Sequence, residues 1–158
     1  MNRSEGSLIG GRSNAPLGDA KIRSVTNTFV GLDQSVPFQL DEVGRTRFVV
    51  ENSEDGPQGK VYFGPDVYPG PGVADPNSAL SMKAAVAHEM SHFHRWQDAT
   101  ELPLGEFTHL DEALTSLDAA LRFSRHLSQH EVEQLIRDAV HRLQLLRAEL
   151  FEGVGQPA

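Results

Sequence analysis

The sequence predicts an α+β fold in which a small N-terminal β layer is followed by three helices. The first half has short runs of β-branched and aromatic residues with partial alternation, which is typical of strands. The second half has apolar residues spaced three and four apart, and each run follows residues that favour the start of a helix. With 158 residues, of which 39% are hydrophobic, the chain suits one compact domain, which we expect over residues 17–158.

Composition excludes several classes of function. Residues 1–16 are rich in Gly, Ser and Asn and lack the apolar run of a secretory signal, so we expect a flexible tail there. The net charge of −8 argues against a nucleic-acid partner, because such a surface repels phosphates. No apolar run approaches the about 20 residues that cross a bilayer, so we expect no membrane partner and a cytoplasmic location. The chain has no cysteine, so any metal must be held by histidine and carboxylate.

The β layer is expected from three segments. They are residues 21–30, 39–52 and 60–64. Within the second, the run R-T-R-F-V-V-E over residues 45–51 is the clearest strand. We expect a turn over residues 53–59, and the proline and glycine density of residues 65–76 excludes regular structure there.

The first helix is expected to start with Asp75 as its cap and Pro76 as its first residue, and to end near Asp98. The second begins where Thr108 and Asp111 have the spacing of a capping box. Its apolar row is Leu110, Leu114, Leu117 and Leu121.

The third helix is expected to begin at a second capping box, formed by Ser128 and Glu131. Its apolar residues alternate steps of four and three, which predicts a single buried stripe along a long amphipathic helix. The residues of the stripe are Val132, Ile136, Ala139, Leu143, Leu146 and Leu150.

The candidate chemistry lies in the first helix, where the sequence reads His88, Glu89, Met90, Ser91, His92. Residues four apart lie on one face of a helix, so His88 and His92 can bind one ion. Zinc accepts imidazole nitrogen, and a catalytic zinc site keeps a position open for water. Glu89 adjoins the first ligand, where it can take a proton from that water and pass it to a leaving amine.

These residues resemble the HExxH motif of the zincin metallopeptidases, and the order of a β layer, a motif helix and a second helix is also similar to theirs. The resemblance implies a minimal zincin-like domain that hydrolyses a protein or peptide substrate with Zn²⁺ held by His88 and His92. It makes Glu89 the general base. In so short a chain, specificity would come from a large substrate or a regulatory partner protein.

Three residues compete as the third ligand. Glu112 follows His92 after 19 residues, a spacing similar to the thermolysin-like gluzincins, and it ranks first. Asp98 stands where metzincins place their last ligand, but Arg95 occupies the position of their helix-breaking glycine. Asp111 has the 18-residue spacing of aminopeptidase-like gluzincins, but that branch has glutamate there. We therefore expect a site of His88, His92 and Glu112.

The zincin resemblance further implies that an extended peptide pairs with an edge strand above the metal, for which residues 60–68 are the candidate. An oxyanion could be stabilised by any of five side chains, none of them distinguished by the sequence. They are Tyr62, Tyr68, His94, Arg95 and His109. This missing donor keeps an alternative open, in which the domain binds metal or a partner without catalysis. A di-iron site of the ExxH type is disfavoured, because the β-rich first half does not suit a four-helix bundle.

Overall fold

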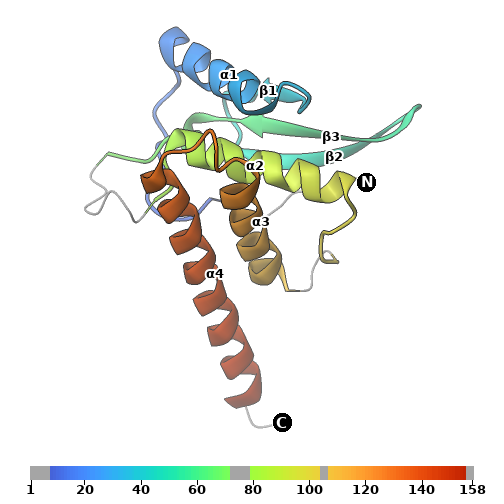
Figure 1. Ribbon diagram of the computed structural model, residues 1–158, viewed down its shortest axis with the longest axis vertical. Helices are drawn as coiled ribbons and strands as arrows, with labels where there is room; N and C mark the ends of the chain where they lie inside the picture. The colour runs from blue at the N-terminus through green and yellow to red at the C-terminus, as the bar shows by residue number, and fades with distance from the viewer. Residues whose placement is uncertain (1–7, 72–78, 104–106, 156–158) are drawn as a thin grey trace.

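The computed structural model describes residues 8–71, 79–103 and 107–155, and the α+β class is confirmed (Figure 1). A small sheet and four helices make up the described part of the chain. In order, these are α1 (Asp19–Asp33), β1 (Phe38–Leu40), β2 (Arg47–Ser53), β3 (Gly56–Phe63), a short 3₁₀ helix (Pro65–Val67), α2 (Met82–Gln97), α3 (Thr108–Arg122) and α4 (Gln129–Gly155).

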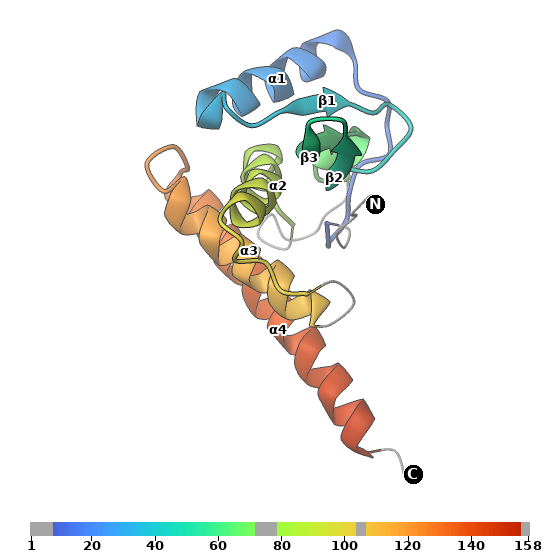
Figure 2. The same ribbon diagram turned by 90° about the vertical axis from the view of Figure 1, so that its right-hand side faces the viewer.

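The elements form layers around α2. The sheet and α1 lie on one side of α2, and α3 and α4 lie side by side on the other (Figures 1 and 2). The core fills the space between the sheet, α1 and α2, where Phe29, Phe48 and Met90 are fully buried. Both flanks of α2 are therefore covered, which explains why almost every residue of its middle turns is buried.

The first helix corrects one prediction. Residues 21–30 were expected to be extended, but they lie within α1. Val25, Phe29 and Leu32 are spaced four and three apart, so a helix places all three on one buried face. Phe29 stacks on Phe38 of β1 with ring centroids 4.5 Å apart. This burial outweighs the modest strand preference of the β-branched residues in the segment.

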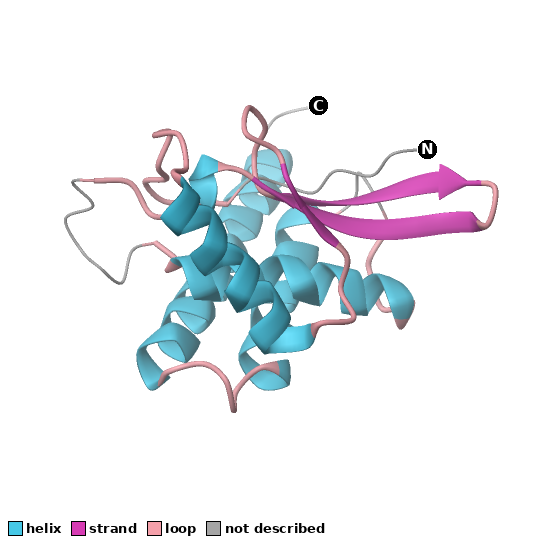
Figure 3. Ribbon diagram, turned by 90° about the horizontal axis from the view of Figure 1, so that it is seen from above, coloured by secondary structure: helices cyan, strands magenta, loops and turns pink. Residues whose placement is uncertain are grey.

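The sheet has the order β1-β3-β2, with β3 parallel to β1 and antiparallel to β2. The turn predicted over residues 53–59 is shorter, because β3 already begins at Gly56, whose φ of 101° permits a tight reversal. Figure 3 shows the hairpin of β2 and β3 extending past the helices. The strand expected as the edge is thus the centre of the sheet, and β2 is an edge.

The structure differs from the predictions in where α2 begins and in how α3 is capped. The helix α2 begins at Met82, where the side chain of Ser81 accepts a hydrogen bond from the Ala84 amide at 3.1 Å. The cap expected at residues 75–76 lies outside the described residues. The helix α3 does begin at Thr108, but without a side-chain cap, since Phe107 with a φ of 53° holds the cap position.

The capping box at the start of α4 is confirmed. The Ser128 amide donates to Glu131 Oε1 at 3.0 Å, and the Glu131 amide donates to Ser128 Oγ at 3.2 Å. Both bonds join residues three apart, so local sequence is enough to predict them.

The apolar stripe predicted to be buried along α4 is instead largely exposed. Of its six members only Ala139 is buried, and Ile136 and Leu150 expose 44% and 54% of their surface. The face of α4 that packs inward carries polar residues, including Gln134, Asp138 and Arg142. The prediction was wrong because it assumed that the apolar face must be the inner one.

The N-terminal segment contacts the fold from Leu8 onward, which corrects the expectation of a free tail for that part. Leu8 is buried. The guanidinium of Arg12 donates to three main-chain carbonyls, those of Asp66, Val67 and Leu80, at 2.6 to 2.8 Å. Within the described residues, no helix is long and apolar enough to cross a membrane.

Candidate metal centre

Two helices bring the three predicted ligands together. His88 and His92 lie one turn apart on α2, and Glu112 lies on the first turns of α3. Glu112 Oε2 is 3.4 Å from His88 Nε2 and contacts His92 Nε2. All three side chains are at most 1% exposed. The close approach of the helices is possible because α3 presents Thr115, Ser116 and Ala119, all small, on its buried face.

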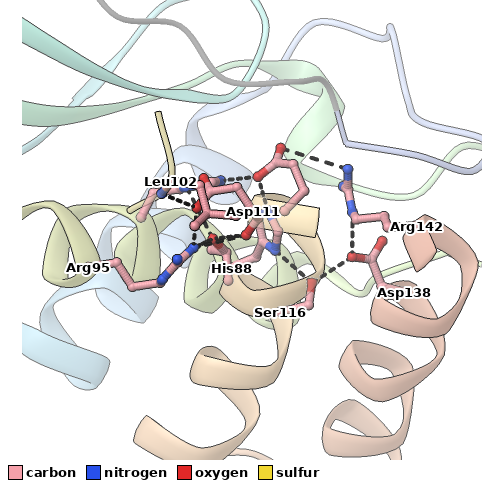
Figure 4. Close-up of polar contacts among 10 residues, drawn as sticks. His88, Arg95, Leu102, Asp111, Ser116, Asp138 and Arg142 are labelled. Carbon is pink, nitrogen blue, oxygen red and sulfur yellow. Dashed lines mark hydrogen bonds and ion pairs between the residues drawn. The ribbon is translucent and has the colours of Figure 1, made fainter. Parts of the chain in front are cut away.

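The hydrogen bonds of the imidazole rings determine which nitrogen atoms face Glu112. Ser116 Oγ donates to Asp138 Oδ2 at 2.5 Å, so it accepts from His88 Nδ1 at 2.8 Å (Figure 4). His88 Nε2 is then unprotonated and turned toward a carboxylate oxygen. Thr115 Oγ1 donates to the carbonyl of Asp111 at 2.8 Å and lies 3.4 Å from His92 Nδ1, which favours the same tautomer.

With these tautomers, the Nε2 atoms of both imidazoles and the carboxylate of Glu112 are electron-pair acceptors that lie close together in a buried site. When its Nδ1 donates to Ser116, neutral His88 has no proton on Nε2 to donate to Glu112 Oε2, 3.4 Å away. Two lone pairs facing each other without a proton between them are unfavourable when buried. A cation held between the two imidazoles and the carboxylate removes this conflict, and two nitrogens with one oxygen suit zinc. The residues present therefore fit a metal ion.

The protonation states of the ligands agree with this fit. Burial alone would raise the pKa of Glu112, but the imidazoles of His92 and His88 outweigh burial and hold this pKa well below its usual range. Burial lowers the pKa of His88 more than the nearby Glu112 carboxylate raises it, so this pKa lies below its usual value. At neutral pH the carboxylate is thus ionised and His88 neutral, the forms that bind metal.

A hydrogen-bonded series of three polar side chains, one on α3 and two on α4, supports the candidate ligands. Asp138 accepts from Ser116 and also from Arg142 Nε at 2.8 Å, while Arg142 Nη1 lies 3.7 Å from Glu112 Oε1. Figure 4 shows Ser116, Asp138 and Arg142 following one another away from His88. This series of side chains begins at His88 and ends at Glu112, so it orients both of these candidate ligands. Sequence reasoning missed it, although Asp138 and Arg142 are polar residues four apart on a helix.

Replacing Asp138 by asparagine is expected to weaken zinc affinity about 10-fold or more, because supporting groups of metal ligands typically contribute 10 to 100-fold. The asparagine keeps the size of the side chain but loses the charge that orders Ser116 and Arg142. Competition with a chromophoric chelator measures the change. Asp118→Asn is the matched control, since Asp118 pairs with Arg122 on the outer side of α3. Equal affinities in the two variants would remove Asp138 from the metal centre.

Glu89 is 1% exposed and lies beside His88 on α2. Neighbouring helical positions are about 100° apart round the axis, so Glu89 borders the ligand face without sharing it. The guanidinium of Arg12, from the N-terminal segment, interacts electrostatically with it. Glu89 is thus a buried carboxylate next to a candidate metal ligand.

Of the other two ligand candidates, Asp98 is not grouped with the histidines, whereas Asp111 lies close to His92 and Glu101 but is also paired with Arg95. Asp98 is the C-terminal cap of α2, where its side chain is 58% exposed and lies 3.4 Å from Arg122. Asp111 Oδ1 pairs with Arg95 at 2.8 Å and accepts from the Leu102 amide. The capping box predicted for Asp111 is therefore wrong, because tertiary partners take its carboxylate. Arg95 also stabilises the helix where metzincins have glycine.

The structure gives a partner outside the metal centre to each of the five oxyanion candidates. Tyr62 donates to Glu51 at 2.8 Å, and Lys21 lies over the Tyr68 ring. The other pairs are His94 with Asp33, His109 with Glu149 and Arg95 with Asp111. None of the five is therefore assigned to the site.

Comparisons of the chain with protein-family models, with curated proteins and with solved structures found no match. We therefore draw function from the residues of this chain alone.

Proposed function

We propose that the chain is a zinc-dependent metallopeptidase of the minimal zincin-like type, with His88, His92 and Glu112 as metal ligands and Glu89 as general base. One observation carries the proposal. Two imidazole nitrogens, each turned inward by a hydrogen bond on the opposite side of its ring, converge with an ionised carboxylate in a buried site. Glu89 borders this site in the position that the HExxH resemblance requires.

The chemistry divides between the metal and the chain. A bound zinc ion would polarise the scissile carbonyl and lower the pKa of a water molecule to about 7. Glu89 accepts the proton of the attacking water and returns it to the nitrogen of the leaving amine, so no net proton is taken up. Glu112 and the two imidazoles hold the ion, and the Ser116, Asp138 and Arg142 chain keeps them in place.

The edge strand β2 is the element best suited to align an extended peptide. Among the described residues it pairs only with β3, so its other edge is open to main-chain hydrogen bonds. Its Phe48 ring is stacked parallel to His92 with centroids 6.3 Å apart, which sets the strand against the metal helix. This replaces residues 60–68, of which residues 60–63 end the central strand β3 and residues 65–67 form the 3₁₀ helix.

A second function is favoured by the burial of the site. His88, Glu89, His92 and Glu112 are each at most 1% exposed, and hydrolysis requires a peptide to reach them. A metal held there without turnover would act as a structural centre that joins α2 to α3, as closed zinc sites do. Both proposed functions require the bound metal, but only the peptidase cleaves peptide bonds.

Cleavage of a peptide library derived from a whole proteome tests the proposal. We expect zinc-loaded protein to generate new peptide termini, identified by mass spectrometry, that disappear after chelation and return when zinc is restored. Zinc binding without any zinc-dependent termini would overturn the peptidase proposal and leave the structural centre.

A further inference from the structure

The outer face of the α3 and α4 hairpin carries apolar side chains on the side turned away from α2. On α3, Leu121 lies about 180° round the axis from Glu112, and on α4, Val140 lies about 200° from Asp138. Both helices thus direct polar residues to the metal centre and apolar residues outward. The outward rows are Leu114, Leu117 and Leu121 on α3, and Ile136, Val140 and Leu143 on α4, exposed by 36% to 79%.

The spacing of these rows is that of helices that pack on other helices. On α4 the predicted stripe alternates steps of four and three from Val132 to Leu150, and the row from Leu110 to Leu121 on α3 does the same. This is the repeat of a coiled-coil seam. Of the seam of α4, Ala139 is buried and Val132 packs against the core, but within the described residues Ile136, Leu143 and Leu150 remain exposed.

The size of the surface matches an interface. With Leu150 and Phe151, which are 54% and 61% exposed, the two rows leave on the order of 800 Å² of apolar surface in water. Patches on monomers typically measure about 300 to 600 Å². One partner in a standard interface contributes about 800 Å². The hairpin therefore exposes the area that a stable dimer buries.

We propose that a second copy of this chain covers this face, with α4 packed antiparallel on α4 of the partner subunit. Charge supports the second copy. Arg147 lies on the exposed face of α4, and Glu133 lies fourteen residues before it, so Val140 is seven residues from each. A two-fold axis at Val140 sets Arg147 beside Glu133 of the partner subunit, and repeats the pair by symmetry.

The axis at Val140 also lies close to the middle of α4, so the two helices overlap along almost their full length. Figure 2 shows α3 lying alongside α4 in the single chain. With α3 flanking α4 in each subunit, the proposed dimer is a four-helix bundle in which neighbouring helices run antiparallel. The metal centres lie on the opposite face of each hairpin, so the dimer leaves them unchanged.

Sedimentation at a series of concentrations tests the dimer. We expect the wild type to have twice the mass of the chain, and the variant with Ile136→Glu and Leu143→Glu to have the mass of one chain with unchanged helix content by circular dichroism. Val43→Glu is the control, because Val43 is 98% exposed in the loop between β1 and β2 and should remain dimeric. A monomeric wild type, or a dimeric double variant, would overturn the proposal.

Charge reversal tests the register. We expect Arg147→Glu and Glu133→Arg each to weaken the dimer about 10-fold or more, because like charges then meet twice. Mixing the two variants should restore affinity, since each chain then supplies what the other lacks. Failure of the mixture to associate better than either variant alone would overturn the antiparallel register about Val140.

Discussion

Replacing Glu89 by glutamine is expected to leave zinc binding intact and to lower peptide hydrolysis about 100-fold or more, the contribution of a positioned general base. Glutamine has the shape of glutamate but does not accept a proton from water at neutral pH. Because Glu89 is in neither group of candidate ligands among the described residues, the loss should fall on kcat with zinc content unchanged. Zinc content and kcat/KM are measured on the same preparation.

The matched control for this variant is Glu42→Gln. Glu42 is exposed in the loop between β1 and β2, so the same chemical change is made outside the metal centre and off the strand proposed to align the peptide. We expect it to retain most of the activity. Full hydrolysis by Glu89→Gln would remove Glu89 from the mechanism, and loss of zinc from Glu89→Gln would make it a ligand instead of a base.

Replacing Glu112 by alanine is expected to weaken zinc affinity more than about 100-fold, beyond the 10 to 100-fold of a supporting residue. Among the described residues, Glu112 is the carboxylate that contacts both imidazoles, and without it the Arg142 guanidinium facing the site is paired with Asp138 alone. Positive charge near the two histidines then opposes a cation. Competition with a chelator measures affinity, and circular dichroism checks that α3 still forms.

Asp98→Ala is the comparison that decides between the ligand sets. Asp98 caps α2 on the surface and contacts Arg122, so we expect its loss to change zinc affinity less than about 2-fold, as surface pairs contribute little. If zinc were lost from Asp98→Ala and kept by Glu112→Ala, the site would be of the metzincin-like kind and Glu112 would serve only to join the helices.

Local sequence was enough to predict the parts of the fold that depend on residues close in the chain. The capping box of Ser128 and Glu131 and the one-turn spacing of His88 and His92 are such parts, because helix geometry alone determines them. The helix α1 was missed since its buried face consists of only three apolar residues, and propensity favoured a strand. The central position of β3 depends on pairing with β1, which no local pattern reveals.

The candidate site also has a part that local sequence predicts and a part that depends on tertiary packing. Glu112 was ranked first from its spacing, and the structure brings it to both histidines. The support from Asp138 and Arg142 was not predicted, because it depends on which face of α4 turns inward. Amphipathic pattern indicates the apolar face as the inner one, and here a polar face is buried against the metal centre and an apolar face is left outside.

Metal content of the purified chain, measured by mass spectrometry beside His88→Ala at equal protein concentration, tests the metal centre most directly. We expect about one zinc per wild-type chain and almost none in the variant, since His88 is a proposed ligand whose other ring nitrogen is already bonded to Ser116. A wild type that holds no metal, even after incubation with zinc, would contradict the metal centre and with it the proposed peptidase.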